Sequence, residues 1–192
     1  MPECLNDDDC LQEFLSFRFY KTESAEPKIL CFFVSLHQKK TSKNRMKRAI
    51  FPGSFNPFTR GHQSIVQRGL QLFDEIVIGI GHNTAKQSDA DVQARLQSIA
   101  ALYRDEPRVS VQIYDTLTVD FAKKVDAKFI LRGVRTVQDF DYELQMADVN
   151  RLLSGIETVV LFAEADKVAI SSSLVRELQQ FGKDVSEYLP KN

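Results

Sequence analysis

Residues 53–62 of this chain read GSFNPFTRGH and carry more information about its fold than any other stretch. They follow a short strand candidate, residues 47–51, and lead directly into a pattern typical of an amphipathic helix. The apolar positions of that helix are Ile65, Val66, Leu70 and Phe73. A strand, a glycine-containing loop and a helix start bring backbone N–H groups and the positive helix end to one point, which suits a phosphate. We expect His62 in the first helical turn, within reach of a bound phosphate chain, so the stretch indicates a nucleotide-handling enzyme.

The side chains of this loop support that interpretation. A histidine near a helix start is more often structural than catalytic, but Gly53 and Gly61 permit a close approach of the backbone to a ligand. Ser54 supplies a hydroxyl donor at the strand end, and His62 supplies a donor that can be cationic near a polyphosphate. Together these residues favour a functional loop.

Short apolar runs alternate with helical patterns from Met46 onward. The predicted strands are residues 48–51, 76–80, 109–113, 129–131 and 158–162, and the last helix is expected over residues 172–181 with Gly182 as its C-cap. Several strands are apolar on both faces, so helices should cover both sides of the sheet. We therefore predict an α/β fold with a doubly wound, five-stranded parallel sheet of Rossmann-like type, and ligands beyond the carboxyl ends of its strands.

A pair of arginines follows the strand predicted at residues 129–131. Arg132 and Arg135 flank a glycine there, and two guanidinium groups match phosphate oxygens well. The alternative is that both are solvated or bind carboxylates such as Asp139 or Asp141. Taken alone, the residue types do not decide between these readings.

A third polar cluster, residues 170–177, reads ISSSLVRE. Consecutive serines at a helix start usually act only as an N-cap, but free N–H groups and three hydroxyls also suit an anion, and Arg176 adds positive charge one turn later. Lys86, in a polar loop after the strand at 76–80, would complete a cationic ring, although a lone surface lysine is normally only solvated.

Composition limits the class of protein. The 192 residues allow one ordinary domain, and a net charge of -1 gives no indication of a nucleic acid or membrane partner. All three cysteines lie within the first 31 residues, so the remainder has no disulfide framework, thiol nucleophile or zinc cluster, which suits a reducing cytoplasm. His37 and His82 have no spaced partners for a metal, and Gly79-Ile80-Gly81 is only a weak dinucleotide signal. The implied chemistry has no covalent intermediate.

Residues 1–45 differ in character from the rest. An acidic cluster and a brief apolar run precede the apolar-free stretch 37–45, a pattern that fits neither a secretory signal nor a transit peptide. The segment is either an appended strand or interaction arm, or a poorly ordered extension. We expect the second, with the functional domain spanning residues 46–192.

The assembled motifs resemble the nucleotidylyltransferase superfamily, which carries a T/H-x-G-H loop after its first strand and an I-S-S-S/T-x-x-R helix start near its end. The matching segments here are TRGH at 59–62 and ISSSLVR at 170–176. Within the superfamily, the chain closely resembles the bacterial phosphopantetheine adenylyltransferase family from Met46 to about Pro190. The segments that carry this resemblance are PGSFNP at 52–57, LRGVR at 131–135, DFDYE at 139–143, NR at 150–151 and YLP at 188–190.

The resemblance implies transfer of an adenylyl group from Mg·ATP to 4′-phosphopantetheine, giving dephospho-coenzyme A and pyrophosphate. It implies catalytic roles for His62, Ser54 and Lys86, with His62 and Ser54 stabilising the reacting phosphorus and Lys86 orienting the attacking phosphate. The ATP-binding residues it implies are Ser54, Phe55, His62, Gly133, Val134, Arg135, Glu143, Lys167, Val168, Ala169, Ile170, Ser171, Ser172 and Ser173. The acceptor-binding residues it implies are Ser54, Lys86, Thr118 and Arg132. It also implies Mg²⁺ bound with ATP, no metal held by the protein, and a homo-oligomer, usually a hexamer.

The chain departs from the family pattern at several positions. Ser54 and Asn56 stand where the family commonly has Thr and Asp, and Thr118 stands where a Met often lines the pantetheine site. Lys-Val-Ala at 167–169 replaces a usual Trp-Ser-Phe, so contacts with adenine are in question there. Two rival functions are a sister nucleotidylyltransferase acting on nicotinamide mononucleotide or a polyol phosphate, and a non-catalytic nucleotide-binding module.

Overall fold

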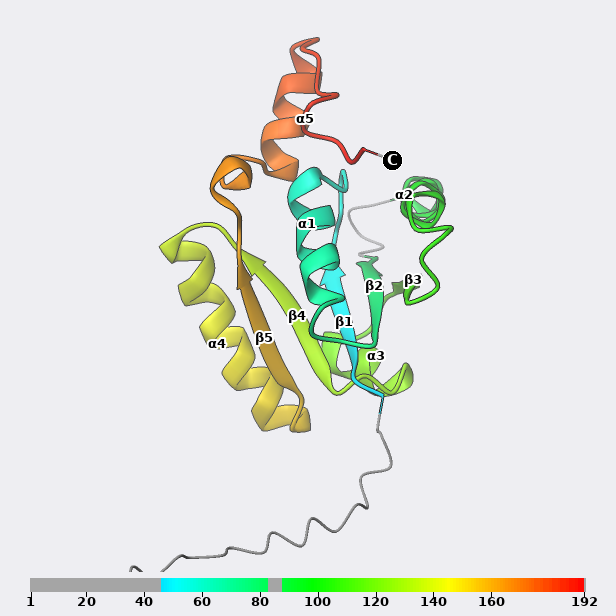
Figure 1. The fold of residues 1–192 in the computed structure, drawn as a ribbon, viewed down its shortest axis with the longest axis vertical. Helices are drawn as coiled ribbons and strands as arrows, with labels where there is room; N and C mark the ends of the chain where they lie inside the picture. Colours follow the sequence, from blue (N-terminus) through cyan, green and yellow to red (C-terminus); the bar gives the residue numbers. More distant parts are fainter. Residues whose placement is uncertain (1–45, 83–87, 192) are drawn as a thin grey trace, which may run out of the picture. The chain divides into compact units, whose positions relative to one another are not determined.

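The computed structural model describes residues 46–82 and 88–191. It contains one parallel sheet of five strands, β1 (Arg48–Gly53), β2 (Glu75–Gly81), β3 (Val109–Tyr114), β4 (Phe129–Val134) and β5 (Glu157–Phe162), in the order β3-β2-β1-β4-β5 (Figure 1). The helices are α1 (Arg60–Gly69), α2 (Asp89–Leu102), α3 (Thr118–Lys124), α4 (Val137–Ser154) and α5 (Ser172–Gln180), with a short 3-10 turn, η1 (Ala165–Lys167), before α5. The predicted doubly wound, five-stranded parallel sheet is confirmed.

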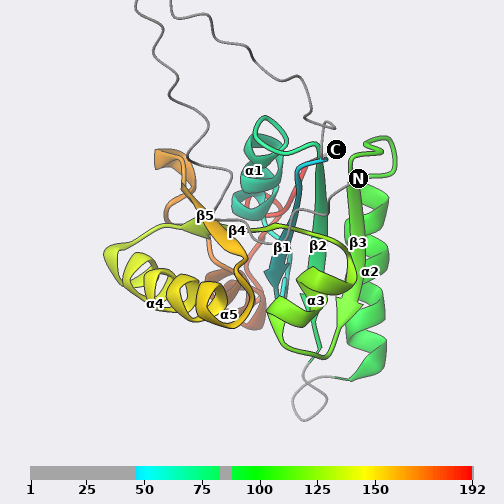
Figure 2. The ribbon, with the colours of Figure 1, turned by 90° about the horizontal axis from the view of Figure 1, so that it is seen from below.

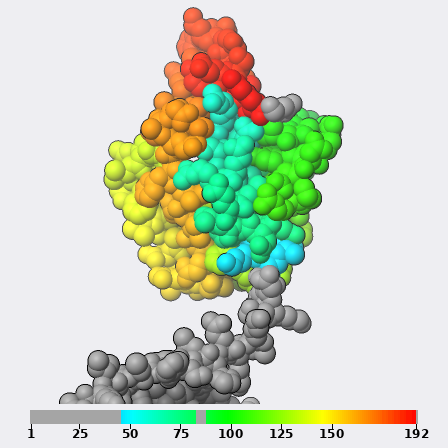
Figure 3. Space-filling model, viewed as in Figure 1, coloured from blue at the N-terminus to red at the C-terminus, as the bar shows by residue number. Residues whose placement is uncertain are grey.

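Alternating strand residues build two apolar layers, one on each face of the sheet. Ala49 and Phe51 of β1 belong to the layer that includes Ile65 of α1, whereas Ile50 belongs to the layer that includes Phe121 of α3. Figure 2 shows α1 and α3 on opposite sides of the sheet. Figure 3 shows the face on which α1 lies between α2 and the segment that follows β5. Burial on both faces explains why the strands are apolar throughout.

The strands extend further than their apolar residues indicate. Residues 52–53 continue the pairing of β1 with β2, and residues 132–134 continue the pairing of β4 with β5. Arg132 and Gly133 therefore lie within β4 and not in the loop after it, because backbone hydrogen bonding continues past the last aliphatic side chain. The last helix also differs slightly, since Phe181 is the C-cap of α5 and Gly182, with a φ of 67°, is the next residue.

Strands β1 and β4 pair over only two positions, Ala49 with Phe129 and Ile50 with Ile130. Their carboxyl ends then separate, and Pro52 of β1 has no N–H with which to continue a ladder. These two strands are the neighbours at which the chain order of the sheet reverses, which is where ligands bind in this architecture.

Helix α1 lies unusually close to β4. A Cβ atom on Gly133 would stand 2.8 Å from Cγ1 of Ile65, and one on Gly69 would stand 2.6 Å from Cδ2 of Leu131. A side chain at either position would therefore force the facing aliphatic side chains to shift. Among the described helices, none is long and apolar enough to cross a membrane.

The hydroxyl group of Tyr103 is buried without a hydrogen-bond partner among the described residues, and burial raises its pKa. An unpaired buried hydroxyl costs about 1–3 kcal/mol. Tyr103→Phe keeps the ring in contact with Phe58, so we expect it to stabilise the protein by about 1 kcal/mol, or roughly 2–4 °C in Tm by calorimetry. Tyr142→Phe, at an exposed side chain, is the matched control and should leave Tm unchanged. A lower Tm for Tyr103→Phe would mean that the hydroxyl is hydrogen-bonded.

Candidate active site

Two cavities meet where β1 and β4 separate. The larger cavity, about 530 Å³, extends towards the ends of β2 and β3. The smaller cavity, about 430 Å³, lies between the start of α1, the end of β4 and the start of α5. Six residues line both cavities: Pro52, Gly53, Ser54, Arg132, Tyr142 and Glu143. The site therefore has two compartments with a common wall.

The first turn of α1 holds His62 in one tautomer. The backbone N–H of Thr59 donates to Nδ1 of His62 over 3.0 Å, within a capping-box arrangement of these two residues. Because Nδ1 accepts this hydrogen bond, the neutral ring carries its proton on Nε2. His62 lines the smaller cavity, so its ring is an N–H donor at that site.

Burial keeps the ring of His62 uncharged. It lies among three phenylalanine rings, Phe51, Phe55 and Phe58, with centroid distances of 6.2, 5.1 and 5.3 Å. Burial, and then the charges of Arg135 and Arg132, lower its pKa from 6.5 to about 4. His62 is therefore neutral in the protein by itself, and the expectation that it can be cationic near a polyphosphate stays a prediction. Sequence reasoning missed this because it follows from the packing of three rings and two arginines around the imidazole.

Arg132 and Glu143 form a bidentate ion pair on the common wall. The distances are 2.8 Å from Nε to Oε2 and 2.5 Å from Nη2 to Oε1, and only 7% of Glu143 is exposed. The third donor, Nη1 of Arg132, bonds the carbonyl oxygen of Pro52 over 2.6 Å. Arg132 thus spans the space between β1 and β4, and it leaves a partly exposed guanidinium beside both cavities.

Arg135 is paired with the carboxylate of Asp139, with 3.1 Å between Nε and Oδ2. In the protein by itself, both arginines therefore bind carboxylates, as in the alternative stated from the sequence. Glu143 is the partner of Arg132, and Asp139 is the partner of Arg135. Arg135, Asp139 and Glu143 nevertheless all line the smaller cavity, so the arginines remain next to the space where a phosphate would bind.

The start of α5 is tied to the loop after β1. Ser171 caps the helix by accepting the N–H of Leu174, as an N-cap serine should. The hydroxyl of Ser172 donates to the carbonyl oxygen of Pro57 over 2.7 Å, and Arg176 donates to that of Asn56. Ser171, Ser172 and Ser173 all line the smaller cavity, so the motif both caps a helix and faces the site.

The structure brings most of the predicted site residues together. The smaller cavity is lined by eleven of the fourteen predicted ATP-binding residues: Ser54, Phe55, His62, Gly133, Arg135, Glu143, Lys167, Ile170, Ser171, Ser172 and Ser173. Val134, Val168 and Ala169 line neither cavity; Val134 is fully buried because it continues β4. Lys167 is held by Glu164 and Asp166 at 2.7 and 3.1 Å. Lys86 lies outside the described residues.

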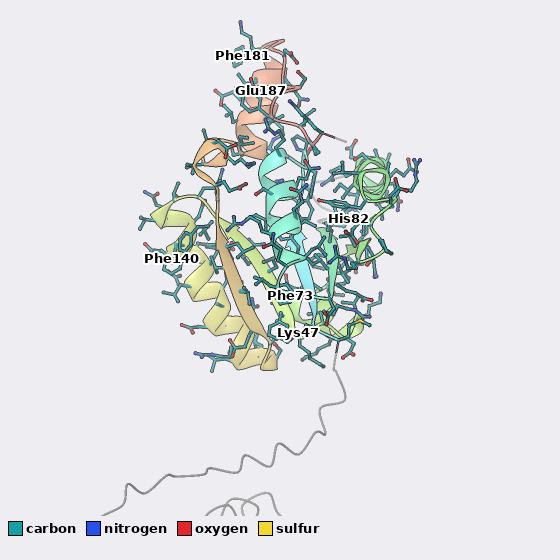
Figure 4. All side chains as sticks on the ribbon, viewed as in Figure 1. Lys47, Phe73, His82, Phe140, Phe181 and Glu187 are labelled. Atoms are coloured by element: carbon teal, nitrogen blue, oxygen red, sulfur yellow. The ribbon has the colours of Figure 1, made fainter. Side chains whose placement is uncertain are left out.

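The larger cavity is lined by Ser54, Thr118 and Arg132, three of the four residues that the resemblance implies for the acceptor. It is also lined by residues that sequence reasoning missed. The missed residues include His82, Asp115, Tyr142 and Asn150. His82 lies between the sheet and α2 (Figure 4), with Nε2 3.3 Å from Oδ1 of Asp89. Arg95 of α2 was also missed; its Nη1 bonds the carbonyl oxygen of Ser54 over 2.5 Å. His82 and Asp115 could have been found in the sequence, because each closely follows a predicted strand. Arg95 could not, because its sequence pattern is that of a solvated helix residue.

The fold and this two-compartment site define a nucleotidyltransferase, and the family model described as Cytidylyltransferase-like matches residues 50–178. The chain is 54% identical over 146 residues to a phosphopantetheine adenylyltransferase of Bacteroides fragilis, and 55% identical to one of Phocaeicola vulgatus; each match covers 76% of this chain and 97% of the relative. A relative of that name from Flavobacterium johnsoniae is 48% identical, over 76% and 95% of the two chains. The chain belongs to the phosphopantetheine adenylyltransferase family.

A solved structure supports the fold at greater distance. A bifunctional NMN adenylyltransferase/ADP ribose pyrophosphatase of Francisella tularensis, complexed with AMP and a manganese ion, matches with a TM-score of 0.56 at 14% identity. The match covers 77% of this chain and 45% of the other. At this identity the similarity concerns the fold alone.

We predict that His62 titrates far below an ordinary histidine. NMR of the ring nitrogens should give a midpoint near pH 4 and the Nε2–H tautomer at neutral pH. His62→Gln identifies the resonance by its loss. Histidine in the unfolded chain has a pKa near 6.5, so the folded state disfavours protonation of His62 relative to the unfolded chain. The free energy of unfolding is therefore fully retained above pH ~6.5 and falls as the pH is lowered towards 4. A midpoint near 6.5 would contradict the buried, neutral ring.

Proposed function

We propose that the protein transfers the adenylyl group of ATP to 4′-phosphopantetheine, giving dephospho-coenzyme A and pyrophosphate. The observation that carries this proposal is the pair of cavities with a common wall of Ser54, Arg132 and Glu143. A transferase that joins two phosphorylated substrates needs them to meet at one phosphorus atom, and positioning of this kind supplies much of the rate. The family to which the chain belongs supports the same reaction.

In this proposal the smaller cavity takes ATP and the larger one takes the acceptor. An oxygen of the acceptor phosphate attacks the α-phosphorus of ATP, the new P–O bond forms, and the bond from that phosphorus to the β-bridging oxygen breaks to release pyrophosphate. Ser54 and the Nε2–H of His62 donate to the oxygens of the reacting phosphorus, where charge builds up. Arg135 and the start of α5 hold the outgoing phosphates, and Arg132 orients the acceptor phosphate.

We also propose that Mg²⁺ arrives with ATP. In sites that handle nucleotides, Mg²⁺ is usually held by substrate phosphates and water with one or two carboxylates. When bound, the ion neutralises phosphate charge. A cytoplasmic location remains a prediction from cysteine use alone.

A homo-oligomer is proposed from the exposed apolar surface of α4. Only Glu143 is buried among the 18 residues of this helix, whereas Val137, Leu144, Leu152 and Leu153 are 53–85% exposed. Phe162 of the edge strand β5, 64% exposed, stacks near Phe140 of α4 and enlarges this surface. Apolar patches of this kind usually mark protein interfaces. The family resemblance suggests a hexamer.

The substrate test compares pyrophosphate release with ATP and 4′-phosphopantetheine, nicotinamide mononucleotide or a polyol phosphate. We expect release only with 4′-phosphopantetheine, and His62→Ala should lower its turnover by roughly two to three orders of magnitude, as loss of a transition-state donor does. A preference for nicotinamide mononucleotide would reject the assignment. Near-normal turnover of His62→Ala would remove His62 from the mechanism, and no release with any acceptor would favour a binding module.

The oligomer test uses light scattering coupled to gel filtration. Leu152→Glu combined with Leu153→Glu places charge on the α4 surface and should reduce the mass measured for the wild type. Leu72→Glu, at another exposed leucine after α1, is the matched control and should leave the mass unchanged. A monomeric wild type would contradict the proposal.

A further inference from the structure

The segment after α5 returns to the start of α1 (Figure 1). Residues 184–191, which we call the C-terminal strap, make three hydrogen bonds to that helix start. The carbonyl oxygen of Tyr188 accepts the backbone N–H of Arg60 over 3.0 Å, and that of Glu187 accepts Nη1 of Arg60 over 3.1 Å. The carbonyl oxygen of Lys191 accepts Nε2 of Gln63 over 3.0 Å. The strap therefore contacts the same helical turn that carries His62.

The strap has its own internal order. The N–H of Tyr188 closes a turn onto the carbonyl oxygen of Val185 over 2.9 Å, and the side chain of Val185 is 8% exposed. The N–H and hydroxyl of Ser186 both donate to the carboxylate of Asp184, and these bonds lower its pKa. A turn with one buried side chain can hold its carbonyl groups in fixed positions.

The strap also takes up one of the free N–H groups at the start of α1. The first N–H groups of a helix have no partner inside the helix. Here the N–H of Arg60 donates to the carbonyl oxygen of Tyr188. The N–H of Thr59 donates to Nδ1 of His62, and the N–H of Gln63 donates to the carbonyl oxygen of Thr59. The N–H of Gly61 has no acceptor among the described residues, and Gly61 lines the smaller cavity. A Cβ atom on Gly61 would stand 3.5 Å from Oγ1 of Thr59 and 3.8 Å from the carbonyl oxygen of Ile170, which is ordinary van der Waals contact.

From this arrangement we infer that the C-terminal strap is a positioning element of the active site, which fixes the first turn of α1 and so directs the Gly61 N–H and His62 Nε2–H at the reacting phosphates. The inference rests on the proposed function for its chemistry, but not for its geometry. Arg60 and Val185 are positioning residues in this account, because neither lines a cavity. Without the strap the N–H of Arg60 would turn to water and the turn would open more readily.

Two pairs of full-length variants test the inference. Arg60→Ala removes one strap contact, and its control is Arg68→Ala on the same helix, where Nη1 donates to the carbonyl oxygen of Phe162 at the far end from His62. Val185→Ala loosens the strap without changing charge, and its control is Val109→Ala, which truncates an equally buried valine of β3. Each variant is measured for kcat, KM, Tm and the midpoint of the His62 titration.

We expect Arg60→Ala and Val185→Ala to lower kcat about tenfold, since small misplacements of catalytic groups have large effects. The midpoint of His62 should rise towards 6.5 as its turn opens, and Arg60→Lys should recover part of kcat. The two controls should keep the wild-type kcat and the wild-type midpoint of the His62 titration, even where Val109→Ala lowers Tm. Unchanged kcat and midpoint in both test variants, or equal losses in tests and controls, would overturn the inference. If the wild type does not use 4′-phosphopantetheine, the proposed function fails, but the titrations still decide the role of the strap.

Discussion

The site depends on the early separation of β1 from β4. Pairing stops after Ile50 and Ile130, and the side chain of Arg132 occupies the place of the missing ladder by bonding Pro52 and Glu143. Removing Arg132 would leave Glu143 as a buried carboxylate without a partner, which costs several kcal/mol. One guanidinium therefore holds two strands and α4 in place and also forms the wall between the cavities.

Charge at the site is balanced before any substrate binds. Arg132 and Arg135 each have a carboxylate partner, and His62 is neutral. A phosphate that reaches either arginine must share it with Glu143 or Asp139. Such a phosphate also favours the protonated ring of His62, because an anion close to a histidine raises its pKa. The protein alone thus fixes these groups in position.

The sequence identified those site residues whose possible chemistry follows from residue type and position in a motif. Ser54, His62, the two arginines and the three serines converge as expected, because parallel strands and helix starts meet at one edge of the sheet. The neutral state of His62 and the contacts of Arg95 and the strap could not be found this way, since they arise between segments distant in the chain. The sequence placed the end of β4 at Leu131, the last aliphatic residue before Arg132, whereas this strand continues to Val134.

The most direct test of the account is a crystal structure of the protein with 4′-phosphopantetheine and an ATP analogue that cannot transfer its adenylyl group. We expect the triphosphate in the smaller cavity beside His62 and Arg135, the acceptor in the larger cavity, and the α-phosphorus next to Ser54 between them. Both ligands in a single cavity, or a triphosphate remote from His62, would contradict the claim that the separation of β1 and β4 creates two compartments for one reaction.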